Sequence, residues 1–192
     1  NYYESNFKRI KMKINLTIIS TLFFCLFLSQ PNYAEIPQTD LEIALLPPFC
    51  HARLRGGVTE SKKWSNRFGS NSYMHLHHYC FGLDSLNKAI TAPTKKQIQT
   101  FLNSALKEFS YVTKHAPPNT LLSLENFIST GKAYKGLGKT DLAIKAFNSS
   151  ISINKHNSKA YMALSDLYIS TGNKTKALQT INEGLKYKPN SK

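Results

Sequence analysis

Cysteine and histidine side chains gather in one stretch of the chain, where their types could support metal or haem chemistry. Cys50 and His51 are adjacent, and a second group follows about 25 residues later. The members of that second group are His75, His77, His78 and Cys80. Thiolate and imidazole are ligands that Zn and Cu accept. This stretch has neither a His-x3-His nor a Cys-x2-Cys spacing, and the Cys-x2-Cys-His sequence of haem attachment is absent. We therefore predict no metal site, and the three clustered histidines remain the alternative ligand set.

The chain offers little material for catalysis. Nucleophilic catalysis needs a nucleophile, a base and an orienting group in one place. Cys50 beside His51 is the one pair that could supply a nucleophile and a base, and oxidation of the thiol would remove the nucleophile. Carboxylates are sparse, and none stands at a spacing that indicates acid–base chemistry. The sequence predicts no catalytic residue and no cofactor.

The balance of charge is strongly basic. The chain has 25 Lys and Arg against 11 Asp and Glu, a formal net charge of +14. Proteins that read nucleic acid usually collect these cations on one element, together with stacking aromatic residues. Here the lysines are spread along the sequence. We therefore expect attraction to acidic surfaces and no specific binding of nucleic acid.

The first 34 residues have the pattern of a secretory signal peptide. Lys11 and Lys13 precede an apolar run over 16–28, and Pro31 and Ala34 follow it. The run is about 13 residues long, whereas a membrane-spanning helix needs about 20. We predict cleavage after Ala34, a translation start at Met12 and a periplasmic or otherwise exported protein. Membrane contact is expected only if this segment is retained as a tether.

Export also bears on the two cysteines that remain after cleavage. An even number of cysteines in an oxidising compartment usually pairs. We therefore predict a disulfide between Cys50 and Cys80, with the nearby histidines packed or facing solvent. Prolines and glycines interrupt the segment 35–73, which shows no sustained period, so we expect it to be mostly irregular.

An internal repeat is the clearest pattern in the sequence. When the chain is shifted by 34 residues against itself, positions from Phe127 to Ser150 align with positions from Tyr161 to Gly184. Large and small residues match in register at seven pairs, which are Phe127 and Tyr161, Ala133 and Leu167, Tyr134 and Tyr168, Gly138 and Gly172, Ala143 and Ala177, Phe147 and Ile181, and Ser150 and Gly184. This period and pattern resemble the tetratricopeptide-repeat (TPR) family.

The resemblance implies an all-α solenoid of helix-turn-helix units over residues 74–188. Two clear repeats occupy 124–157 and 158–191, and a degenerate repeat occupies 74–118. In the degenerate copy, Gly82 and Ala105 are separated by about 11 more residues than their counterparts, which indicates an insertion around 89–94. We expect about six helices in this domain, because isolated repeats bury too little apolar surface to be stable. The stretches 46–53 and 74–80, with Trp64, also resemble small exported TPR proteins of gammaproteobacteria.

TPR proteins use the concave face, lined by the first helix of each pair, to bind peptides or partner proteins. Mapped onto this sequence, the resemblance gives a partner-binding groove of eight residues, which are Glu125, Ile128, Lys132, Lys135, Lys159, Met162, Asp166 and Ile169. Lysines beside apolar side chains favour a partner segment that is both acidic and apolar. The function expected is an exported, non-catalytic scaffold or adaptor in the assembly of an envelope complex. The alternative is a metal- or haem-handling periplasmic protein that uses the segment 50–80.

Overall fold

A computed structural model of the protein describes residues 36–37 and 39–187. The predicted signal peptide, the cleavage site after Ala34 and the start at Met12 lie outside these residues, as does the end of the second repeat. Among the residues described, no helix is both long enough and apolar enough to cross a bilayer.

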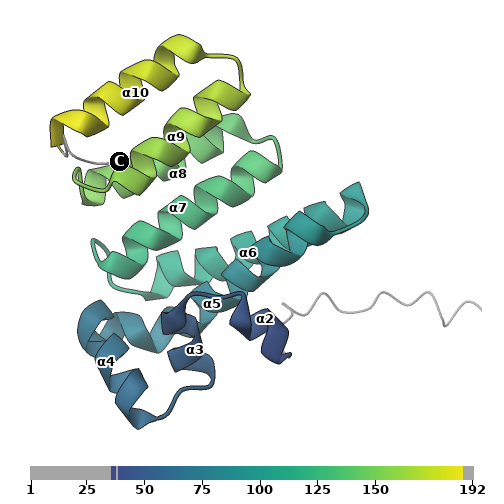
Figure 1. The fold of residues 1–192 in the computed structure, drawn as a ribbon, viewed down its shortest axis with the longest axis vertical. Coiled ribbons are helices and arrows are strands. Elements are labelled where there is room, and N and C mark those ends of the chain that lie inside the picture. Colours follow the sequence, from purple (N-terminus) through teal and green to yellow (C-terminus); the bar gives the residue numbers. More distant parts are fainter. Residues whose placement is uncertain (1–35, 38, 188–192) are drawn as a thin grey trace, which may run out of the picture. The chain divides into compact units, whose positions relative to one another are not determined.

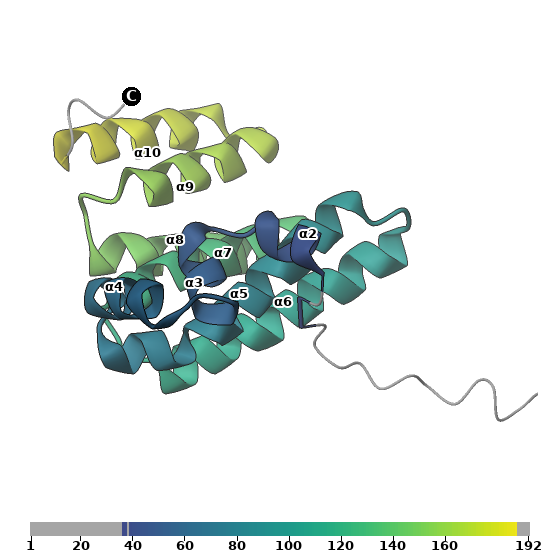
Figure 2. The same ribbon diagram turned by 60° about the horizontal axis from the view of Figure 1, so that its bottom comes forward.

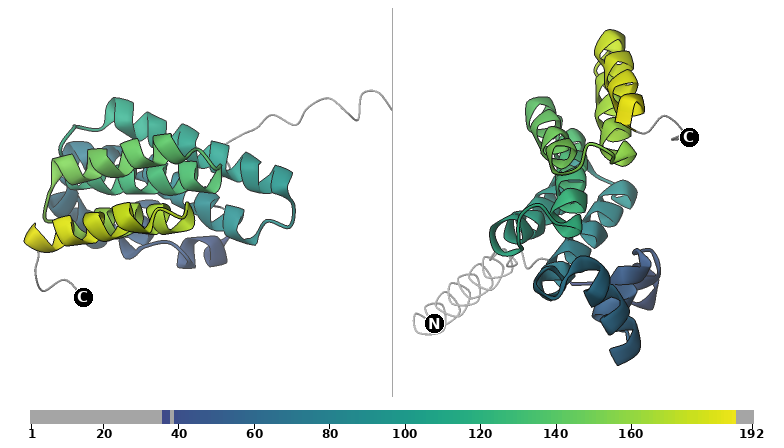
Figure 3. Two further views of the ribbon diagram at one scale, coloured as in Figure 1. Left: turned by 90° about the horizontal axis from the view of Figure 1, so that it is seen from above. Right: turned by 90° about the vertical axis from the view of Figure 1, so that its left-hand side faces the viewer.

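The regular secondary structure of the described residues is entirely α-helical, so the all-α prediction is confirmed. The helices, labelled as in Figure 1, are α2 (Asp40–Ala44), α3 (Pro48–Leu54), α4 (Val58–Phe68), α5 (Ser70–Thr91), α6 (Lys95–His115), α7 (Leu121–Gly136), α8 (Thr140–Ile153), α9 (Ser158–Ser170) and α10 (Lys174–Tyr187). The last six form three antiparallel pairs, α5 with α6, α7 with α8, and α9 with α10. Each pair packs on the next, and the second view in Figure 3 looks nearly along the helices of this stack.

The two clear repeats turn in the same way within each pair. Gly138 has φ 71° and Gly172 has φ 78°, a left-handed conformation that glycine adopts without a steric penalty. The amide of Lys139 donates to the carbonyl of Tyr134 at 2.9 Å, and that of Asn173 donates to Tyr168 at 2.8 Å. These bonds satisfy carbonyls at the end of the first helix. The 34-residue period of the sequence is therefore also a period of backbone geometry.

The pair of helices α5 and α6, where the degenerate repeat is predicted, shares a close contact with the first clear repeat. A Cβ atom added to Gly131 of α7 would clash with the ring of Phe147 on α8. One added to Gly82 of α5 would clash in the same way with Phe109 of α6. Both rings are fully buried. In both of these pairs, a glycine of the first helix thus lets a phenylalanine of the second helix approach its backbone.

The expected insertion near 89–94 takes the form of longer helices. The helices α5 and α6 have 22 and 21 residues, whereas α7 and α8 have 16 and 14. The turn between α5 and α6 is short and contains Pro93, and Thr94 caps α6 by accepting a bond from the amide of Gln97. The additional residues thus lengthen the first pair at the end where this turn lies.

The prediction of an irregular segment over 35–73 is wrong for most of its described residues. Three short helices, α2 to α4, occupy it and pack against one another and against α5 (Figure 2). Thr39 and Glu42 form a capping box at the start of α2. Pro48 is the first residue of α3, a position where the backbone N–H that proline lacks would have no partner within the helix. The prolines and glycines therefore separate short helices here, and they do not prevent them.

Two apolar clusters form the core, and α7 contributes to both. The first cluster joins α3 and α4 to α5 and α6, with Leu76 and Phe109 fully buried at its centre. The second joins α7, α8 and α9 around Phe147. Leu122 of α7 belongs to the first cluster and Leu124 to the second. The sides of α5, α7 and α9 that lie outside these two clusters remain exposed.

Candidate functional site

The first helices of the three pairs pack in sequence, α5 on α7 and α7 on α9. Their exposed sides make up what we call the first-helix face. The predicted groove residues all come from α7 and α9, and the structure brings several of them together. Lys159 pairs with Glu125 at 3.0 Å, and the ammonium of Lys135 donates to the carbonyl of Asp166 at 3.4 Å. Residues 34 and 31 positions apart are thus neighbours on adjacent first helices.

These contacts change the chemistry that the predicted groove can offer. The charge of Lys159 is countered by Glu125, so it attracts an acidic partner less than its sequence position indicated. Met162 and Ile169 are exposed on α9, by 52% and 58%, and are open to a partner. Ile128 is a correction to the predicted groove. It is 4% exposed because it packs in the same cluster as Phe147, and it therefore belongs to the core.

Lys132 has a different setting from the other predicted residues. It is exposed on α7 and lines a pocket of about 350 Å³ between α5, α6 and α7. The rest of the lining is mainly apolar, with Leu83, Leu86, Ala89, Ile90, Ile98 and Leu102 contributing. Among the described residues the Lys132 ammonium has no ion-pair partner. A free cation at an apolar pocket can hold an apolar side chain and a carboxylate together.

The apolar part of this pocket was not predicted. Its residues come from α5 and the start of α6, which are the lengthened helices of the degenerate repeat. A shift of 34 residues does not align them with the clear repeats, so the repeat pattern gave no signal for them. The clue available in the sequence was Ile90, an apolar residue within the predicted insertion at 89–94.

The predicted disulfide is present between Cys50 of α3 and Cys80 of α5, with Cα atoms 5.6 Å apart. Both cysteines are fully buried. Cys50 is therefore not a free thiol, and its proximity to His51 provides no nucleophile. The ring of His51 instead bonds the carbonyl of Leu46 at 2.9 Å, which ties the start of α3 to the preceding turn.

The clustered histidines are engaged with protein groups. His78 lies 2.6 Å from a carboxylate oxygen of Glu108 and stacks on Tyr111, with ring centroids 3.6 Å apart. His77 contacts the guanidinium of Arg53 at 3.3 Å. The ring centroid of His75 lies 5.8 Å from that of Tyr111. Within the described part of the chain, no three His, Cys, Asp or Glu side chains are arranged to hold a metal ion, so nothing here supports the metal alternative.

Protonation of this cluster is expected to cost stability. Burial, together with the neighbouring charges of His78 and Arg53, lowers the pKa of His77 to about 4 from an ordinary value near 6.5. In the unfolded chain His77 binds its proton near pH 6.5, but in the folded protein only near pH 4. The unfolding free energy should therefore fall as pH drops from 6.5 to 4, by about 1–2 kcal/mol once solvent screening is allowed for.

The measurement is urea unfolding at several pH values for the wild type and His77→Gln. The difference in stability between the two proteins should move in favour of the variant as the pH falls through this window. A difference that stays constant from pH 7 to pH 4.5 would show that His77 is not the titrating group.

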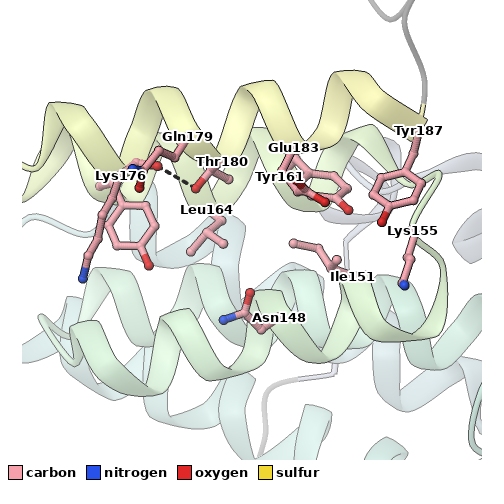
Figure 4. A pocket seen from close by; sticks show the side chains of 11 residues that line it. Asn148, Ile151, Lys155, Tyr161, Leu164, Lys176, Gln179, Thr180, Glu183 and Tyr187 are labelled. Atoms are coloured by element: carbon pink, nitrogen blue, oxygen red, sulfur yellow. Dashed lines mark hydrogen bonds between the residues drawn. The ribbon is translucent and has the colours of Figure 1, made fainter.

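A second and larger pocket lies at the second helices, α8 and α10, of the last two pairs. It has a volume of about 580 Å³ and opens between α8 and α10, with α9 behind it (Figure 4). Its lining includes Tyr161, Tyr168 and Tyr187, as well as Lys155 and Lys176. The sequence reasoning did not select these residues, because it took the partner face from the first helices alone.

Comparisons with known proteins agree with this architecture. A sequence model of the family described as "Tetratricopeptide repeat" matches residues 136–192. The chain is also 29% identical over 86 residues to the anaphase-promoting complex subunit CDC16 of Saccharomyces cerevisiae. That match covers 45% of this chain and 10% of the yeast subunit, so the chain spans about a tenth of that relative's length.

The fold and these matches define a class of protein. The chain has an all-α TPR solenoid fold, and the family match supports the TPR family for the part that runs from the end of α7 through α10. TPR repeats support a role in protein–protein interaction.

Proposed function

We propose that this protein is an exported, non-catalytic scaffold whose first-helix face holds an acidic and apolar segment of a partner protein. The observation that carries the proposal is the cation of Lys132, which has no ion-pair partner among the residues described, at the apolar pocket between α5, α6 and α7. An apolar side chain of the partner would enter the pocket. A carboxylate near it would meet Lys132, and the net charge of +11 on the residues after Ala34, from 21 Lys and Arg against 10 Asp and Glu, would steer the encounter.

The apolar contact would contribute most of the affinity. Ile90 is 82% exposed at the rim, and burying a side chain of this kind stabilises a complex by roughly 1.5–3 kcal/mol. The ion pair would act mainly on partner choice and association rate. Met162 and Ile169 extend the exposed apolar surface onto α9, so a longer segment could continue there.

Two features support export as part of the proposal. The first 34 residues have the pattern of a secretory signal, and a buried disulfide joins Cys50 to Cys80. A scaffold of this type in an oxidising compartment would serve the assembly of envelope complexes. The partner would then be an exported or membrane-bound protein.

The binding test uses a displayed library of random peptides and the purified protein. Selected peptides should be rich in acidic and large apolar residues, and Lys132→Glu and Ile90→Asp should each weaken their binding at least tenfold in fluorescence polarisation. That factor corresponds to about 1.4 kcal/mol. Lys139→Glu is the matched control, since it makes the same change of charge at an exposed turn outside the pocket.

The control separates pocket recognition from general attraction between opposite charges. If Lys139→Glu weakens binding as much as Lys132→Glu does, the positive charge of the whole protein accounts for the effect. If the selected peptides bind Ile90→Asp and Lys132→Glu as well as the wild type, this face is not the binding site.

A further inference from the structure

We propose a second binding site, in the groove between α8 and α10, for an extended acidic segment that has one apolar residue between two acidic residues. We call this pocket the second-helix groove. It involves none of the residues that line the pocket at Lys132, so the two sites can be tested separately.

The floor of the second-helix groove is apolar. Ile151 of α8 and Leu164 of α9 lie at its middle, and the ring of Tyr161 lies beside them (Figure 4). Tyr161 is 4% exposed and packs closely against Gly184 of α10, so this wall is fixed. A groove of about 580 Å³ with three tyrosine rings in its lining has the size of a ligand site.

Each end of the groove carries a lysine beside a tyrosine ring. The ammonium of Lys155 lies 5.7 Å from the ring centre of Tyr187, and that of Lys176 lies 5.7 Å from the ring centre of Tyr168. Figure 4 shows Lys155 and Lys176 at opposite ends, with Leu164 between them. A cation–π contact of this kind positions the lysine without neutralising it. The groove thus offers two positive ends and an apolar centre.

The carboxylate of Glu183 also lines the groove, and it is paired mainly with a lysine outside the lining. Glu183 lies 2.7 Å from the ammonium of Lys186, and this hydrogen bond is the main cause that lowers the pKa of Glu183, with a smaller contribution from the charge of Lys155. The charge of Lys155 is therefore offset only in part. At the same end, His156 bonds the carbonyl of Tyr187 at 2.8 Å, which fixes the end of α10 against the turn before α9.

The spacing of the two ends determines the ligand pattern. Lys176 and Tyr187 are both on α10, and a rise of 1.5 Å per residue places them roughly 16 Å apart along its axis. In an extended peptide, residues i and i+4 are about 13 Å apart and point to the same side as residue i+2. Glutamates at i and i+4 would meet the two lysines, and an apolar residue at i+2 would meet the floor.

Amide side chains favour a peptide over another anionic ligand. Asn148 comes from α8 and Gln179 from α10, and both line the groove (Figure 4). An amide side chain both donates and accepts hydrogen bonds, as the backbone of an extended peptide requires. The chain of a fatty acid would leave these groups without partners.

The experiment measures binding of a fluorescein-labelled peptide that contains Glu-Ser-Leu-Ser-Glu between flexible ends, at low salt. We expect saturable binding below about 1 mM to the wild type, and at least a tenfold loss for Lys155→Glu combined with Lys176→Glu. A peptide with serine in place of the leucine should bind at least five times more weakly. Absence of saturable binding to the wild type would overturn the proposal.

Two control proteins complete the test. Lys107→Glu combined with Lys139→Glu makes the same change of net charge at exposed positions outside the groove, and should keep the affinity within twofold. If Lys132→Glu loses this peptide while Lys155→Glu combined with Lys176→Glu keeps it, the peptide binds the first-helix face and the second-helix groove is not its site. If the Lys107 and Lys139 control loses as much affinity for the peptide as the Lys155 and Lys176 variant does, nonspecific attraction between charges explains the binding and the proposed site is wrong.

Discussion

Replacing Phe147 with alanine should lower the free energy of unfolding by about 3–5 kcal/mol. Its ring is fully buried at the centre of the cluster that joins α7, α8 and α9. Because each helix pair contacts mainly its neighbours, the damage should concentrate at that end of the stack. Hydrogen exchange should accelerate most in α8, α9 and α10. The helices α5 and α6 should stay protected, since Phe109 and the disulfide hold a separate cluster.

The close approach of Gly131 to this ring offers a matched control. Gly131→Ala alone should destabilise the protein, because its new methyl group would clash with the Phe147 ring. In the Phe147→Ala background the same methyl group would have space, and the better helix propensity of alanine should recover up to about 1 kcal/mol. A Gly131→Ala effect of the same sign in both backgrounds would contradict the packing described here.

The repeat could be predicted because the same physical requirement recurs at a fixed interval. In the two clear repeats the chain turns through a left-handed glycine, Gly138 and Gly172, and in two of the pairs a small residue lies beneath a large one. Gly82 and Gly131 are these small residues. These requirements restrict residue type at single positions, so they are visible in one sequence.

Other parts of the fold depend on contacts that have no period. The helices α2 and α3 have only five and seven residues, too few to show a clear helical pattern, and the aromatic residues of α3 and α4 pack against one another and against α5. Phe49 packs edge-on to Trp64 and Phe68 and stacks on Tyr79, at centroid distances of 5.2–6.2 Å. Prolines and glycines in this segment suggested irregular structure, but tertiary contacts decided the outcome.

The candidate site was predicted only in part for a related reason. A repeat alignment gives the helix on which a residue lies, and it placed Lys132 and Met162 on first helices. It does not give burial, and Ile128 proved to be part of the core. Nor does it show spaces between helices, such as the second-helix groove that α8, α9 and α10 line together.

Removal of the disulfide should be the second large effect. The Cys50–Cys80 bond spans 30 residues of sequence, and constraining a loop of this length stabilises a fold by roughly 3–4 kcal/mol in the chain-entropy model. We expect Cys50→Ala combined with Cys80→Ala to lose about this much in urea unfolding. The loss should begin in α2 to α4, whose other connections to α5 include bonds from Arg53 to the carbonyls of Tyr73 and Met74.

Trypsin would report that local loss directly, because Arg55 is exposed in the turn between α3 and α4. Cleavage there should accelerate both in the double variant and in the reduced wild type, whereas the oxidised wild type should resist it. Equal cleavage of the oxidised and reduced proteins would show that packing alone holds these helices.

Alkylation of thiols in protein taken from cells tests export through the same bond. Complete protection of both cysteines is the result expected from an oxidising compartment, and full alkylation would contradict export.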